Sequence, residues 1–191
     1  MNDRNIQPRP VTKAYLERAA LHYLSRYSAT EARLAEVLAR KVLRRCAGLE
    51  VPTDEQSEWI VEVVARCVNL GYVNDATYAR RRAARMIARG RPPHQIAQDL
   101  RSKGVDRVLV ESILADMSAE FGEGRLALEA GIAYARRRRF GPFRRQDSPV
   151  PPDKARKERD AMLRSGFSPD VVRRVLEADD EEDFLPWADC S

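Results

Sequence analysis

Apolar residues recur along this chain three and four positions apart, the spacing that gathers them on one face of an α-helix. A clear example is the set Trp59, Ile60, Val63, Val64, Cys67 and Leu70. The pattern predicts helices over residues 12–27, from 28 to about 45, over 53–70, 74–89 and 92–103, and from 106 to beyond 114. An internal repeat, described below, adds helices over 121–140, 153–165 and 168–178.

Residues that commonly cap helices stand at the predicted helix starts. The segments Ser28-Ala29-Thr30-Glu31 and Thr53-Asp54-Glu55-Gln56 are each predicted to form a capping box, in which the first and fourth residues exchange hydrogen bonds. Single caps are expected at Thr12, Asn74, Asp106 and Ser168, and helix ends with a left-handed glycine at Gly71, Gly90 and Gly104.

The pattern also repeats. Residues 100–114 and 163–176 share Leu-Arg-Ser, a glycine, an apolar residue, a cap and a second helix. The expected fold is therefore all-α, a tandem array of three three-helix (helix-turn-helix-like) repeats, elongated and curved. The expected divisions are a flexible N-terminal arm (1–11), repeats at 12–71, 72–118 and 119–178, a mobile Pro-rich loop (140–152) inside the third repeat, and an acidic C-terminal tail (179–191).

Composition fits helices with solvated faces, since 33% of the 191 residues are charged and 43% are hydrophobic. No apolar run has the length of a membrane span, and the first residues lack the apolar segment of a secretory signal. The cysteines, Cys46, Cys67 and Cys190, are scattered and odd in number, which favours free thiols in a reducing cytoplasm.

Charge is divided unevenly along the chain. Residues 1–176 hold all 34 Lys and Arg against 22 of the 29 Asp and Glu, a net +12, and residues 177–191 hold the other 7 acids. A basic body favours a polyanionic partner, or a protein that carries one. The acidic end is expected either to be solvated and disordered or to fold back on the Arg-rich surface and compete with that partner.

Arginines supply the candidate binding residues. Arg81, Arg85 and Arg89 are four apart and form one stripe of a helix, with Arg82 on its flank. The full candidate set is Arg81, Arg82, Arg85, Arg89, Arg91, Arg101, Lys103, Arg136, Arg137, Arg138, Arg139, Arg144 and Arg145. The alternative for any single arginine is an ion pair with an acid of a neighbouring helix.

The sequence gives little indication of base stacking, metal binding or catalysis. Tyr72, Tyr78 and Trp59 could stack on bases, but their positions favour core packing. His22 and His94 have no Cys or acid at ligand spacing, so no metal is expected. The chain holds no phosphate-binding loop, nucleophile elbow or paired carboxylates, so neither an enzyme nor a cofactor is expected.

The segment Leu-Gly-Tyr-Val-Asn-Asp (70–75), followed by Tyr78-Ala79, Gly90, Ile96, Leu100, Lys103-Gly104 and Ile113, resembles the RecX family. The opening of the chain is similar to that family as well, through Ala20, Tyr23-Leu24, Arg26, Ser28, Glu31, Leu34, Leu38 and Lys41. The chain departs from the family at Val42, where Gly is usual, and at Pro92-Pro93.

The resemblance implies an all-helical regulator that binds RecA, lies along the groove of its filament on single-stranded DNA, and limits recombination and co-protease activity. It implies no cofactor and no catalysis, and the expected state is a monomer in the cytoplasm with no membrane contact. Two alternatives remain open at this point. One is a helix-turn-helix regulator of duplex DNA built on residues 92–114, and the other is a helical adaptor without a nucleic-acid role.

Overall fold

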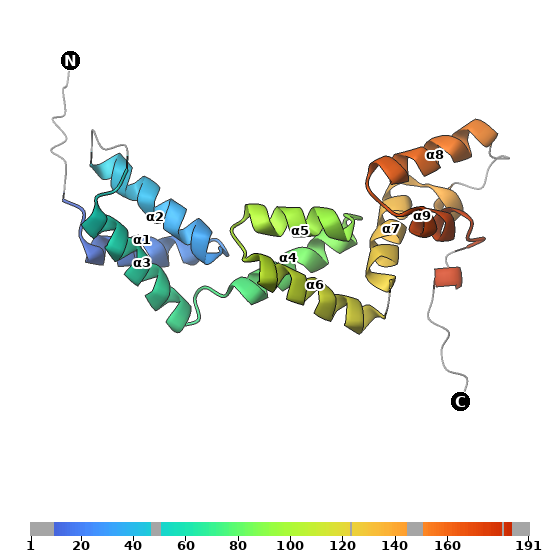
Figure 1. The fold of residues 1–191 in the computed structure, drawn as a ribbon. Helices are drawn as coiled ribbons and strands as arrows, with labels where there is room; N and C mark the ends of the chain where they lie inside the picture. Colours follow the sequence, from blue (N-terminus) through green and yellow to red (C-terminus); the bar gives the residue numbers. More distant parts are fainter. Residues whose placement is uncertain (1–9, 47–50, 123, 145–150, 181, 185–191) are drawn as a thin grey trace, which may run out of the picture. The chain divides into compact units, whose positions relative to one another are not determined.

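The computed structural model describes residues 10–46, 51–122, 124–144, 151–180 and 182–184. The regular secondary structure of these residues is helical (Figure 1). In chain order the helices are α1 (Lys13–Leu24), α2 (Glu31–Arg45), α3 (Asp54–Asn69), α4 (Asp75–Ala88), α5 (Pro93–Ser102), α6 (Arg107–Phe121), α7 (Arg125–Arg138), α8 (Pro152–Arg164) and α9 (Pro169–Leu176), with short 3-10 turns η1 (Gly141–Phe143) and η2 (Glu182–Phe184).

The chain divides into two compact units, each described here by itself. Unit 1 comprises Met1–Ala79 and Ser102–Asp106, and unit 2 comprises Arg80–Arg101 and Arg107–Ser191. The prediction of an all-α protein is confirmed. The division into three repeats, and the elongated and curved shape, stay predictions.

In unit 1, α3 packs against both α1 and α2 (Figure 1). The core between them is the predicted apolar face, with Leu16, Leu38 and Val42 fully buried. The Cys67 thiol belongs to this core, and burial, the largest cause, raises its pKa, with Arg66 opposing the shift. The caps at Thr12 and Thr53 are confirmed, and Thr53 forms the complete capping box with Gln56.

The start of α2 corrects the capping box predicted at Ser28. The helix begins at Glu31, and its cap is Thr30, whose hydroxyl accepts from the Arg33 N–H at 3.1 Å. The same hydroxyl donates to the Lys103 carbonyl at 2.6 Å, and Thr30 is fully buried. Ser28 is exposed, so a tertiary contact selects Thr30 over a residue with equally good local capping chemistry.

The segment Leu70–Asp75 places successive residues in different roles. Gly71 ends α3 with φ at 74°, Val73 is buried, and the Asn74 side chain caps α4 by accepting from the Thr77 N–H at 2.7 Å. The Asp75 carboxylate accepts from the Glu31 N–H of α2 at 2.9 Å. Burial raises the pKa of Asp75, and this hydrogen bond opposes the shift. The segment therefore ends α3, caps α4 and gives the first amide of α2 a hydrogen-bond partner.

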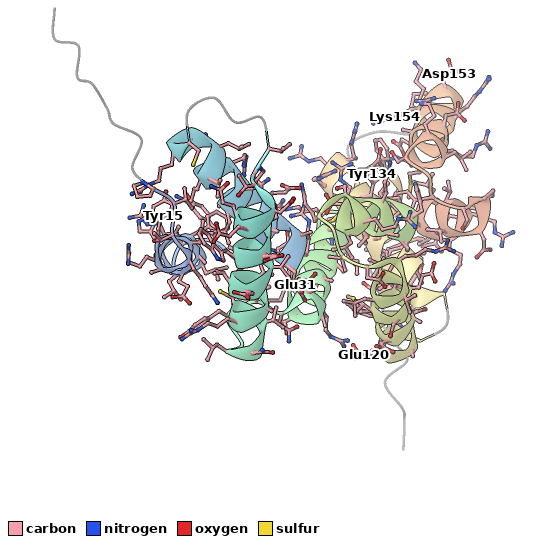
Figure 2. The ribbon with its side chains drawn as sticks, turned by 60° about the vertical axis from the view of Figure 1, so that its left-hand side comes forward. Tyr15, Glu31, Glu120, Tyr134, Asp153 and Lys154 are labelled. Atoms are coloured by element: carbon pink, nitrogen blue, oxygen red, sulfur yellow. The ribbon has the colours of Figure 1, made fainter. Side chains whose placement is uncertain are left out.

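In unit 2, α7 is the most buried helix and packs against α6 and α9 (Figure 1). Small residues permit the close contacts. Gly131 faces Val171 and Val175 of α9, and an added Cβ there would lie 2.8 Å from the Val171 side chain. Tyr134, labelled on α7 in Figure 2, accepts from the Ser165 hydroxyl at 2.8 Å and so ties α7 to the end of α8.

The predicted helix 121–140 is wrong at its start. Helix α6 continues to Phe121, beyond the predicted repeat boundary at 118, and α7 begins at Arg125. Gly122 and Gly124, with φ at 91° and 71°, adopt the left-handed conformation between them, which a continuous helix does not contain. In the predicted mobile loop, residues 145–150 lie outside the described residues, as does most of the predicted N-terminal arm.

Candidate binding surface

The arginine stripe predicted on α4 is exposed. Asn74 and Gly90 set the ends of the helix, and Ala83 and Ile87 bury its opposite side. The stripe consists of Arg81, Arg85 and Arg89, all exposed. Four-residue spacing places these side chains one above another, so they offer their charge along one line.

The flank of the stripe differs, because its arginines hold ion pairs. Arg82 is partly buried, with 30% of its side chain exposed, and its Nη2 donates to Asp99 Oδ1 of α5 at 2.8 Å. Arg80 pairs with Glu120, labelled near the end of α6 in Figure 2. Arg82 therefore fits the alternative in which an arginine pairs with an acid of a neighbouring helix. Within the described residues, the three stripe arginines form no ion pair of this kind.

The remaining candidates of the central segment are exposed. Arg91 follows α4 and its Nη1 donates to Gln95 Oε1 at 3.3 Å, and Arg101 lies in the last turn of α5. Lys103 has an exposed side chain in unit 1, while its backbone carbonyl holds Thr30.

The C-terminal end of α7 carries the second cluster. Arg136, Arg137, Arg138 and Arg139 are exposed. The Arg136 guanidinium carbon lies 5.1 Å from the centre of the Phe143 ring, and that of Arg138 lies 5.4 Å from the centre of the Tyr134 ring. Cations at the C-terminal end of a helix also interact favourably with its carbonyls. Arg139 ends the helix in the left-handed conformation, with φ at 59°.

Arg144 has a structural partner. Its Nε donates to both oxygens of Glu158 at 3.0 Å, and Glu158 is buried, with 3% exposure. The same carboxylate accepts from the Gly141 N–H at 3.1 Å. This arrangement fastens η1 to α8. The last candidate, Arg145, lies outside the described residues.

Sequence reasoning missed a hollow of mixed character on unit 1. Its volume is about 230 Å³, and its lining includes Leu21, Cys67, Leu70 and Tyr72 together with the ion-paired Glu17 and Arg66. The prediction that Tyr72 packs in the core is wrong, since 57% of Tyr72 is exposed. The buried position after Gly71 goes to Val73 instead. Trp59 and Tyr78 are half-buried.

Among the residues that the structure describes, no helix combines the length and the apolar character needed to cross a membrane. Within the same residues, no group of three or more His, Cys, Asp or Glu side chains is arranged to hold a metal ion.

Comparison with known proteins agrees with this fold. A family model described as the second three-helix domain of RecX matches residues 74–114, which contain the whole α4 stripe. The regulatory protein RecX of Myxococcus xanthus is 37% identical over 172 residues, covering 90% of this chain and 89% of that protein. The regulatory protein RecX of Halorhodospira halophila is 29% identical over 167 residues, covering 86% and 88%.

Solved structures show the same fold. The crystal structure of RecX from Lactobacillus salivarius aligns with a TM-score of 0.61 at 22% identity, covering 86% of this chain and 94% of that one. A second crystal structure of regulatory protein RecX aligns with a TM-score of 0.60 at 20% identity, covering 87% and 72%.

The fold and the relatives together define an all-helical regulatory protein that presents clusters of exposed arginines. The chain belongs to the RecX family.

Proposed function

We propose that the protein binds the RecA filament on single-stranded DNA and limits its ATPase, strand-exchange and co-protease activities, and so modulates recombination and DNA repair. It acts by binding, as a cytoplasmic monomer without a cofactor. The observation that carries the proposal is the exposed stripe of Arg81, Arg85 and Arg89 inside the segment matched to the RecX model.

The chemistry of the stripe supports this partner. A protein filament on DNA offers phosphates and carboxylates, and the planar guanidinium group donates two parallel hydrogen bonds to either. Three arginines along one line of α4 suit a partner whose anionic groups also recur along a line.

The decisive experiment adds the purified protein, below stoichiometric amounts, to RecA filaments on single-stranded DNA and follows ATP hydrolysis and strand exchange. We expect inhibition by the full chain. The combined variant Arg81→Ala, Arg85→Ala and Arg89→Ala should need about tenfold more protein at low salt, since three exposed contacts of about 0.5 kcal/mol each correspond to that factor.

A matched control removes the same charge elsewhere. Arg33, Arg107 and Arg173 are exposed, and each pairs with an acid three or four residues away on its own helix. Replacing all three with alanine should leave inhibition within about twofold. These arginines lie outside the stripe, and the loss of an exposed ion pair of this kind changes the stability of the fold little.

Two outcomes would oppose the proposal. Absence of inhibition by the full chain would remove it, and protection of a duplex site in footprinting would then favour a duplex-binding regulator. Equal losses in the stripe variant and the control variant would show that net charge, and not the α4 stripe, determines binding. Circular dichroism should give the same helical signal for the three proteins.

A further inference from the structure

The strongest unassigned feature of unit 2 is an aromatic and cationic cluster around Phe143. After Arg139 the chain turns through Gly141 into η1, and the Phe143 N–H donates to the Phe140 carbonyl at 3.1 Å. Glu158 fixes this turn through the Gly141 N–H and Arg144. The Phe143 ring is therefore held in place by a buried carboxylate and not by its own loop alone.

An arginine and an aromatic ring lie against the Phe143 ring. One is the Arg136 guanidinium, 5.1 Å from the ring centre. The other is Phe184, whose ring is stacked on Phe143 with centres 6.1 Å apart and planes 18° apart. A half-buried aromatic ring beside an arginine is the combination on which unpaired bases stack in single-strand binding proteins.

Phe184 comes from the acidic end of the chain. The Asp183 carboxylate accepts from the Asp179 N–H at 2.8 Å, and Asp180 accepts from the Asp183 N–H at 3.3 Å, so the segment closes its own turn. Arg125 Nη2 of α7 donates to the Phe184 carbonyl at 2.9 Å. The acidic segment is thus attached to η1 by an aromatic stack and to α7 by a hydrogen bond.

We propose that Phe143 and Arg136 form a stacking platform for a base of single-stranded nucleic acid, and that Phe184 occupies the place of that base in the free protein. The described acids of the same segment, Glu177, Asp179, Asp180 and Asp183, would then compete with the phosphates of that strand for the arginines at the end of α7. The acidic segment is a removable cover, and a single strand must displace it.

This inference deepens the proposed function by assigning a single-strand subsite and its regulation, and it rests on that function only in taking single-stranded nucleic acid as the partner. Its test contains no RecA. If the variants bind single strands as expected but the chain does not inhibit RecA, this inference stands and the proposed function fails. If the chain inhibits RecA but the variants do not change single-strand binding as expected, the proposed function stands and this inference fails.

The test measures the anisotropy of a labelled oligothymidylate at low salt with full-length variants. Phe184→Ala should tighten binding about fivefold, the factor that corresponds to the roughly 1 kcal/mol of an aromatic pair. Adding Phe143→Leu, which keeps an apolar side chain but removes the aromatic face, should weaken binding by about fivefold or more relative to Phe184→Ala alone.

The chain offers a matched control in Phe121, an exposed phenylalanine at the end of α6. Phe121→Leu in the Phe184→Ala background should leave the affinity unchanged. A duplex of the same length should lose no affinity on Phe143→Leu, because paired bases offer no free face. The inference is overturned if Phe184→Ala binds no tighter than the natural chain, or if Phe143→Leu and Phe121→Leu have equal effects.

Discussion

Thr30 connects two distant parts of unit 1 through one hydroxyl group. It caps α2 by accepting from the Arg33 N–H, and it satisfies the Lys103 carbonyl by donating a hydrogen bond to it. A hydroxyl can do both because it carries one donor and two acceptor sites. Ser28, two residues earlier, has the same chemistry but is exposed.

Thr30→Val should lower the free energy of unfolding of unit 1 by about 2 kcal/mol, since it removes a cap and leaves a carbonyl without its partner. Thr30→Ser should retain most of the stability, because the hydroxyl remains. Urea unfolding followed by Trp59 fluorescence, in a Trp187→Phe background, measures the change.

Ser28→Ala is the control for that measurement, and its expected effect is below about 0.5 kcal/mol. A larger loss from Ser28→Ala than from Thr30→Val would restore the capping box inferred from the sequence and contradict the assignment of Thr30 as the cap.

At the level of elements, glycines decide how closely helices approach one another. Gly90 follows α4 with φ at 71°, and an added Cβ would lie 2.5 Å from backbone atoms of Tyr134 on α7. Gly124, before α7, has the same φ of 71° but nothing within 4 Å of an added Cβ. Comparing an alanine at Gly124 with an alanine at Gly90 therefore separates the free-energy cost of the left-handed backbone from the cost of a steric clash.

Gly124→Ala should lower the free energy of unfolding by about 1 kcal/mol, the cost of a left-handed residue with a side chain. Gly90→Ala should cost about 2–4 kcal/mol, because a backbone clash is added that only a shift of α7 can relieve. Urea unfolding followed by circular dichroism compares them. Equal losses would mean that α7 moves away from Gly90 at no cost.

The elements that sequence could predict are those with local signals. Gly71 and Gly90 end helices because of their own backbone freedom, and Asn74 caps α4 through a residue three positions away. The start of α2 depends instead on Lys103, far along the chain, which no local pattern shows. The start of α7 was inferred from the repeat comparison, and the local signal of Gly122 and Gly124 was the better guide.

The features of the candidate binding surface also differ in how far sequence could predict them. Helical spacing was sufficient to predict an exposed line of Arg81, Arg85 and Arg89. It could not predict that Arg82 pairs with Asp99, or Arg144 with Glu158, because each acid comes from a different helix. Periodicity indicates which way a side chain points, whereas its partner depends on how the helices pack.

On the scale of the whole molecule, charge and stability are both distributed unevenly. The body to residue 176 carries a net +12, and the acids after it lower the total to +5. The two compact units, each with its own buried residues, are expected to unfold in more than one step. A single melting temperature would therefore combine the properties of both units.

The buried Cys67 thiol offers a way to follow unit 1 alone. In a Cys46→Ser, Cys190→Ser background it is the remaining cysteine, and its 5% exposure together with its raised pKa should slow alkylation about a hundredfold or more relative to an unfolded peptide. Alkylation at the peptide rate in the absence of denaturant would mean that this core opens freely.

The same thiol can then locate a partner. A ligand that binds only the closed form of unit 1 slows labelling in proportion to its occupancy, whereas one that contacts only unit 2 leaves the rate unchanged. The alkylation rate of Cys67, a residue with no expected part in binding, thus reports which of the two compact units a partner contacts.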